Sequence, residues 1–231
     1  MEEILRAHLD APESVLQNFL RYGERLKQAN AVTNLTAIRD DEGIARLHFL
    51  DSAALLALAD FSGRDVVDVG TGAGFPGLPL RLLQPDMRLT LLDSNNKKID
   101  FLQGVCTELA PDVRCLWGRA EELGELRESF DIAVSRAVAE LEMLAELCLP
   151  LVRPGGLFIA MKKPDCDAEV QQAAFAVKAL GGRLRGVTRY TVPGTDVEHA
   201  AVLIDKIKAT PAQYPRRWAQ IKKKPLKGES Q

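Results

Sequence analysis

The sequence predicts an α/β protein built around a mostly parallel sheet. Short apolar runs rich in β-branched residues alternate with segments of helical periodicity, which is the pattern of parallel strands joined by crossover helices. The first run, residues 66–69, ends abruptly in glycines, as the opening strand of a nucleotide-binding sheet does. The last two runs leave no room for a helix between them, so we expect them to pair antiparallel.

The residues ahead of the first strand predict helices. Apolar side chains recur at helical spacing over residues 11–30, the pattern breaks at 33–36, and a second apolar stripe runs over about 40–58. We expect residues 1–60 to form an N-terminal helical extension that covers either the ligand edge or one face of the sheet.

Strands and helices then alternate through a predicted domain of residues 61–208. The predicted strands are 66–69, 89–93, 113–116, 132–134, 157–161, 184–190 and 200–204. The predicted helices are one after the glycines to about 83, then 95–109, 141–149 and 167–180. Five parallel strands followed by a hairpin give a seven-stranded, Rossmann-like sheet with a terminal antiparallel strand, which is the layout of class I methyltransferases.

The spacing of the glycines indicates which ligand the first turn holds. Gly70, Gly72 and Gly74 follow a G-x-G-x-G pattern, and Phe75 stands where a dinucleotide fingerprint has its third glycine. No Lys-Ser or Lys-Thr follows, which excludes a P-loop. Asp93 ends the second strand about 20 residues on, where a ribose-binding acid belongs. The combination favours a nucleoside without phosphate, of which S-adenosylmethionine is the common one; the alternative is a glycine-rich turn that binds nothing.

Composition narrows the class of protein further. The formal net charge is −2, so no global basic field points to nucleic acid. The four cysteines form no C-x-x-C pair; we expect free, buried thiols in a reducing compartment and no metal site. The chain starts with acidic residues and has no long apolar run, so we expect a cytoplasmic protein without a membrane segment.

An ordered set of motifs resembles the glucose-inhibited division protein B family, over about residues 15 to 226. The motifs are Asn34-Leu35-Thr36, Leu47-His48-Phe49-Leu50-Asp51-Ser52, the glycine stretch through Leu80, Leu91-Leu92-Asp93-Ser94, Gly118-Arg119-Ala120-Glu121-Glu122, Ser135-Arg136-Ala137 and Tyr214-Pro215-Arg216-Arg217. These bacterial enzymes methylate guanine N7 in small-subunit (16S) ribosomal RNA. The resemblance implies the same fold, S-adenosylmethionine as cofactor, and 16S ribosomal RNA or the small subunit as partner.

The resemblance also implies roles for particular residues. By resemblance the cofactor would be bound by Gly70, Phe75, Ala120, Glu121 and Arg136. The glycine turn and the end of the second strand add Gly72, Gly74, Asp93 and Ser94 to the candidate cofactor-binding residues. The candidate catalytic residues are Arg136, Arg119 and Lys162. Guanine N7 carries a lone pair and no proton, so its methylation needs alignment rather than a general base.

Several of these residues could instead have a purely structural role. Arg136 could form a surface salt bridge, and Glu121 could be a solvated acid at a helix start. His48 suits a structural role as well as an RNA contact. Asp51 and Ser52 could cap or brace the loop of Asn34.

The C-terminal residues 209–231 predict a basic tail. Eight cations follow one another without an intervening acid: Lys206, Lys208, Arg216, Arg217, Lys222, Lys223, Lys224 and Lys227. Together with Tyr214 and Trp218 they favour RNA, and the alternative is a solvated terminus.

Two other functions remain open beside the RNA methyltransferase. One is a noncatalytic S-adenosylmethionine-binding or RNA-binding protein on the same fold, and the other is a small-molecule methyltransferase whose N-terminal helices form a lid. We expect a monomer that binds neither a membrane nor a metal.

Overall fold

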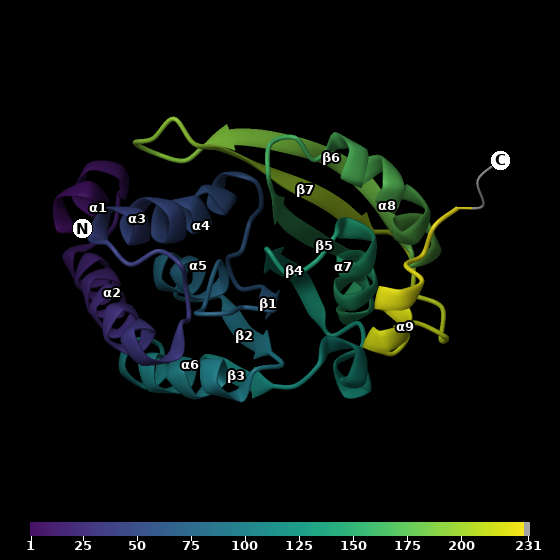
Figure 1. The fold of residues 1–231 in the computed structure, drawn as a ribbon, viewed down its shortest axis with the longest axis horizontal. Coiled ribbons are helices and arrows are strands. Elements are labelled where there is room, and N and C mark those ends of the chain that lie inside the picture. Colours follow the sequence, from purple (N-terminus) through teal and green to yellow (C-terminus); the bar gives the residue numbers. More distant parts are fainter. Residues whose placement is uncertain (229–231) are drawn as a thin grey trace.

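The computed structural model describes residues 1–228 and places a twisted sheet between two groups of helices (Figure 1). The strands are β1 (Asp65–Val69), β2 (Arg88–Asp93), β3 (Arg114–Trp117), β4 (Phe130–Arg136), β5 (Val152–Lys162), β6 (Gly182–Thr191) and β7 (Glu198–Lys206). The α-helices are α1 (Glu2–His8), α2 (Glu13–Thr33), α3 (Asp41–Gly43), α4 (Asp51–Ala53), α5 (Gly77–Leu83), α6 (Asn96–Leu109), α7 (Leu141–Cys148), α8 (Asp167–Ala179) and α9 (Trp218–Lys223). One π-helix is present within the described residues, η1 (Ile44–Leu50). The 3-10 helices are η2 (Ala54–Ala57), η3 (Ala120–Glu122), η4 (Gly124–Leu126) and η5 (Leu149–Leu151).

The sheet has the predicted topology. Its seven strands lie in the order β3-β2-β1-β4-β5-β7-β6. Strands β1 to β5 pair in parallel, and β7 runs antiparallel to both β5 and β6. The strand order reverses at β1 and β4, so the carboxyl ends of these strands flank a crevice where α/β sheets bind ligands.

Each face of the sheet has its own hydrophobic core. Helices α1, α2, α5 and α6 pack with η1 on one face, and α7, α8 and α9 pack on the other (Figure 1). The N-terminal helices contribute fully buried Phe19, Tyr22 and Phe49 to the same apolar cluster as Val66 of β1. The extension therefore covers one face of the sheet and shares its core.

The glycine turn is held by a buried carboxylate. Asp68 Oδ2 accepts hydrogen bonds from Thr71 Oγ1 at 2.7 Å and from the Gly77 amide at 2.8 Å, which ties the end of β1 to the start of α5. Burial raises the pKa of Asp68 to about 6. Gly70 has φ +70°, a backbone conformation that glycine adopts without strain, and an added Cβ there would collide with Val138.

Residues 41–57 form one continuous helical rod that changes pitch along its length. It begins as α3, widens into π-helical η1, and continues through α4 and η2. Such π segments are rare and occur frequently at functional sites. The rod agrees with the helix predicted over about 40–58, and it carries His48 and Asp51 toward the sheet edge.

The C-terminal segment packs against the body of the protein. Ile221 of α9 is fully buried, and Tyr214, Trp218 and Leu226 pack onto the core beneath α7. Arg127 donates hydrogen bonds to the carbonyls of Thr210, Pro211 and Tyr214, which fastens the chain ahead of α9. The last three residues of the predicted tail lie outside the described residues.

Two of the eight predicted tail cations turn out to be structural. Lys206 is buried at the end of β7, where its ammonium donates to Val152 O and Thr210 Oγ1, and burial lowers its pKa to about 8. Arg216 pairs with the fully buried Glu146. The sequence analysis counted both among the cations that favour RNA, because a sequence does not reveal which cations meet a buried acceptor.

Two further expectations concern membranes and thiols. None of the helices within residues 1–228 is both long and apolar enough to cross a membrane. The four cysteines are free thiols; three are buried, as predicted, and Cys115 is half-buried.

Candidate functional site

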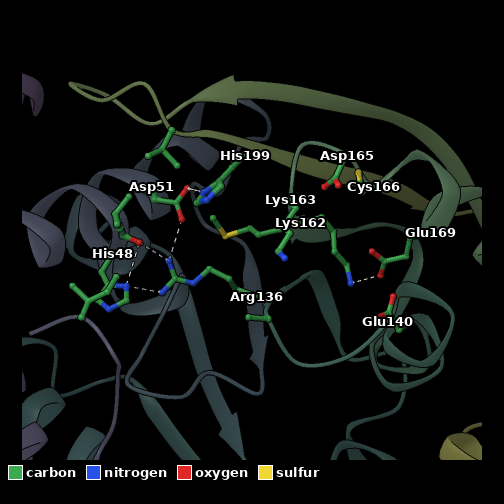
Figure 2. A pocket seen from close by; sticks show the side chains of 15 residues that line it. His48, Asp51, Arg136, Glu140, Lys162, Lys163, Asp165, Cys166, Glu169 and His199 are labelled. Carbon is green, nitrogen blue, oxygen red and sulfur yellow. Dashed lines mark hydrogen bonds and ion pairs between the residues drawn. The ribbon is translucent and has the colours of Figure 1, made fainter.

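Two cavities open at the carboxyl edge of the sheet. The narrower one, of about 190 Å³, lies beyond the ends of β1, β2 and β3. It is lined by Val69, Gly70, Leu92, Asp93, Ser94, Gly118, Arg119, Ala120, Glu121, Val138, Leu147 and Trp218. The wider one, of about 620 Å³, lies beyond β4 and β5 and is lined among others by Leu47, His48, Asp51, Arg136, Glu140, Lys162 and His199 (Figure 2). Most residues predicted to bind the cofactor thus line the narrow cavity, whereas Arg136 and Lys162 line the wide one.

Asp93 fixes the floor of the narrow cavity. Its Oδ2 accepts from the Gly72 amide at 3.0 Å, and its Oδ1 accepts from the Asn95 amide at 2.8 Å. Lys98 Nζ lies 3.6 Å from Oδ2. The carboxylate therefore joins the glycine turn after β1 to the start of α6, and it faces the cavity where a ribose acid is expected.

Glu121 brings a buried carboxylate without a hydrogen-bond partner to the same cavity. Its side chain is only 5% exposed, and its Oε1 lies 3.9 Å from Arg119 Nη1, beyond hydrogen-bond distance. Within residues 1–228, Oε1 has no hydrogen-bond partner. Because a buried polar atom left unpaired is costly, this oxygen points to a ligand that donates a hydrogen bond. The alternative of a solvated acid is incompatible with its burial.

Arg136 is the centre of a hydrogen-bond network at the end of β4. Nη1 donates to Leu47 O at 3.0 Å and to Asp51 Oδ2 at 3.1 Å, and Nη2 donates to His48 Nδ1 at 3.1 Å (Figure 2). The guanidinium also lies 5.1 Å above the ring of Phe75. Three of the five N–H donors of an arginine are used in this way. Arg136 is thus anchored to the rod of residues 41–57, not paired loosely at the surface.

His48 is a neutral hydrogen-bond acceptor toward Arg136. Burial, reinforced by the Arg136 cation, lowers its pKa to about 4. With Nδ1 accepting from Arg136, Nε2 must carry the proton, and it donates to Thr36 Oγ1 at 2.8 Å. The imidazole stacks on Phe75 at 4.3 Å. These contacts give His48 a structural role at the wall of the wide cavity.

Asp51 connects Arg136 to the hairpin of β6 and β7. This fully buried carboxylate accepts from Tyr190 Oη at 2.9 Å and from His199 Nδ1 at 2.8 Å, as well as from Arg136. Asp51 therefore does not brace the loop of Asn34, and Ser52 instead donates to His48 O. Sequence reasoning missed Tyr190 and His199, since their partner is more than a hundred residues away; the available signal was the polar His199 at the start of the apolar strand β7.

Lys162 and Glu169 form the opposite wall of the wide cavity (Figure 2). The Lys162 ammonium donates to Glu169 Oε1 and, at 2.7 Å, to Ala139 O. Glu169 also accepts from the Leu141 amide. These bonds hold Lys162 between α7 and α8, so its catalytic role stays a prediction. Arg119 is half-exposed at the rim of the narrow cavity.

Gly74 and Phe75 lie behind the site. An added Cβ at Gly74 would collide with Tyr22 Oη, and Phe75 is buried between Tyr22 and His48. Neither residue is among those lining the two cavities. Packing against neighbouring side chains is sufficient to explain why glycine and phenylalanine stand at these two positions. Their contact with a cofactor stays a prediction.

The loop after β4 separates the two cavities. Ala137, which lines the wide cavity, has φ +56°, a left-handed conformation that is unfavourable for alanine. Val138 lines the narrow cavity, and its side chain lies over Gly70. The backbone at Ala137 thus directs consecutive side chains into different cavities.

The fold is shared with solved methyltransferase structures. TrmN from Thermus thermophilus superposes with a TM-score of 0.54 at 22% identity, over 68% of this chain and 48% of that one. TYW2 of M. jannaschii, solved in complex with AdoMet, gives 0.57 at 13% identity, over 74% and 80%. The seven-stranded order, the glycine turn and the ligand crevice define the fold of class I S-adenosylmethionine-dependent methyltransferases.

Sequence comparison identifies the family. Residues 15–193 match the GidB family, described as rRNA small subunit methyltransferase G. Proteins named ribosomal RNA small subunit methyltransferase G are 46% identical in Clostridium perfringens and 43% identical in Exiguobacterium sibiricum. These alignments cover 93% and 94% of this chain, and 92% and 94% of the relatives. The chain belongs to this family, which confirms the resemblance drawn from its motifs.

Proposed function

We propose that this chain transfers a methyl group from S-adenosylmethionine to N7 of a guanine in 16S ribosomal RNA. The observation that carries the proposal is the pairing of the two cavities at one sheet edge. The narrow cavity offers carboxylates for a nucleoside, and the wide cavity beside it holds an anchored arginine. The description of the family supports a small-subunit ribosomal RNA substrate, and the choice of N7 rests on the resemblance.

The residues of the narrow cavity fit the nucleoside part of the cofactor. Asp93 would accept from the ribose hydroxyls, and the unpaired Glu121 Oε1 would accept from the exocyclic amine of adenine. Gly72 has open space where a Cβ would stand, which lets the backbone approach the ligand. The bound cofactor supplies a methyl group on a positively charged sulfur.

The protein's contribution to the reaction is alignment. Guanine N7 has no proton to remove, so no side chain needs to act as general base. Arg136 is held by Asp51, His48 and Leu47 O, and its remaining N–H donors are available to the base or a phosphate of the RNA. Holding the guanine at about 3–3.5 Å from the methyl group accounts for the catalysis that such a site can provide.

The experiment is methyl transfer from labelled S-adenosylmethionine to two substrates, deproteinised 16S RNA and small subunits. Both substrates come from cells that lack the modification. Mass mapping locates the product, and strand scission after borohydride and aniline treatment identifies N7-methylguanosine. Label at another atom would overturn the N7 assignment. Cofactor binding without transfer would favour a noncatalytic binding protein. Label in small molecules alone would favour a small-molecule methyltransferase.

We infer further that the enzyme acts as a monomer in the cytoplasm, where its ribosomal substrate is made. Within the described part of the chain, no three His, Cys, Asp or Glu side chains gather as metal ligands would. That methylation proceeds without a metal is a proposal, which retention of activity after chelation would support.

A further inference from the structure

We propose that Trp218 is part of the S-adenosylmethionine site and packs against the adenine base. The inference rests on the proposed function, because it takes the narrow cavity as the cofactor site. Trp218 lies outside residues 15–193, which the family model matches, and it comes from the segment predicted to be a basic RNA-binding tail. The structure instead places it in the lining of the narrow cavity, together with Asp93 and Glu121.

The position of Trp218 is fixed from both sides. Two residues before it, Arg216 donates to the buried Glu146, with Nε at 2.8 Å from Oε1 and Nη2 at 2.6 Å from Oε2. Three residues after it, Ile221 is fully buried against α7. The indole is itself half-buried in the same apolar cluster. A side chain held in this way forms a preorganised wall, so little conformational entropy is lost when a ligand contacts it.

The placement of the cavities indicates which part of the cofactor meets the indole. The methyl group has to point toward the wide cavity beyond β4 and β5, which is lined by Arg136 and is the proposed site of the RNA. The opposite end of the cofactor then lies beyond β2 and β3, beside Glu121. We assign this end to the adenine, because the unpaired Glu121 Oε1 can accept from its exocyclic amine and because the faces of its flat ring suit an aromatic or apolar wall.

The experiment measures the affinity of S-adenosylhomocysteine and of methylthioadenosine, which lacks the amino-acid part, by calorimetry on the full chain. Trp218→Ala should weaken both by about fivefold or more, the loss typical of removing an aromatic that stacks on a base. Tyr214→Ala is the matched control, because Tyr214 packs on the same cluster without lining the cavity. It should lower the melting temperature while leaving both affinities within about twofold.

A second measurement leaves Trp218 in place. The chain has two tryptophans, so Trp117→Phe makes Trp218 the sole indole fluorophore. Methylthioadenosine should then change its emission in step with binding seen by calorimetry.

Unchanged emission despite binding would overturn the inference, as would Trp218→Ala affinities equal to those of the wild type. If Trp218→Ala weakens only S-adenosylhomocysteine, the indole faces the amino-acid part and the adenine assignment is wrong. If neither the wild type nor Asp93→Asn binds either probe, the narrow cavity is not a cofactor site and the proposed function itself fails.

Discussion

At the scale of single residues, the site depends on side chains that are anchored before any ligand arrives. Arg136 illustrates this, because its donors meet a carbonyl, a buried carboxylate and a neutral imidazole on one helical rod. The network implies that Arg136→Ala would damage the fold as well as activity, since it removes the cationic partner of the buried Asp51. A conservative exchange is therefore the informative one.

Arg136→Lys should lower the rate of methylation by about 100-fold, because an ammonium cannot contact Asp51, His48 and the RNA with one planar fork. The ion pair with Asp51 is kept, so stability should fall only by about 1 kcal/mol for the lost hydrogen bond to His48. Rates and melting temperatures are compared with those of Arg153→Lys, since Arg153 pairs with Asp131 at the other end of the same sheet. Equal rates in the two variants would assign Arg136 a purely structural role.

His48 predicts a pH dependence of stability. Its pKa is about 4 in the folded protein against 6.5 in the unfolded chain, so between these values the unfolded chain binds a proton that the folded protein does not. The His48 contribution should therefore fall by up to about 3 kcal/mol as the pH drops from 6.5 to 4. Urea denaturation across this range measures it as the difference between wild type and His48→Asn.

His48→Asn keeps an acceptor for Arg136 but does not titrate. The raised pKa of Asp68 acts in the opposite direction over part of the same range, and it cancels because both proteins contain Asp68. Parallel stability curves for the two proteins would contradict the depressed pKa of His48.

At the scale of secondary-structure elements, the local hydrophobic pattern predicted the strands and the longer helices. The apolar, β-branched runs predicted all seven strands. In the central strands β1 and β4, burial on both faces demands apolar residues, whereas the edge strand β6 is mostly exposed. The helix predicted over 40–58 gave no hint of its π-helical turn, and α1 and α9 were not predicted because each is too short for a clear periodic stripe. Contacts between distant elements, such as Asp51 with Tyr190, could not be predicted from one sequence.

The loop after β4 gives a prediction at this scale. Ala137 adopts a left-handed conformation, so Ala137→Gly should relieve strain and stabilise the fold by about 0.5–1 kcal/mol. Ala139 lies in the same loop without a positive φ, so Ala139→Gly should destabilise through the greater freedom of the unfolded chain. Chemical denaturation of both variants measures the two effects. Equal losses would show that the conformation at Ala137 is not strained.

At the scale of the whole molecule, charge is distributed unevenly along the chain. The net charge is −2, yet residues 206–227 contain eight cations and no acid. Lys206 pairs with the half-buried Glu128 and Arg216 pairs with the buried Glu146, which leaves six exposed cations on the segment that carries Trp218. This segment is packed beside the narrow cavity. We predict that its exposed charges contact RNA bound at the neighbouring wide cavity. The sequence predicted the charge, but only the fold shows that the segment is not a free end.

Lys222 and Lys223 of this segment should contact RNA phosphates without determining which guanine is methylated. Each contact releases counterions, with a slope of about −0.7 per contact when the logarithm of affinity for single strands is plotted against that of salt concentration. Lys222→Gln with Lys223→Gln should flatten the slope for substrate RNA by up to about 1.4 and leave the methylated position unchanged. Truncation is unsuitable, because it removes the buried Ile221.

The matched control is Arg183→Gln with Arg185→Gln, which changes the net charge equally on β6, where both arginines already pair with Asp205. Affinities across a salt series are measured for the wild type and both double variants. If the control flattens the slope as much as the lysine variant does, the attraction belongs to the net charge and not to α9. If neither changes it, the exposed cations of α9 are solvated and the RNA is bound by the cavity walls alone.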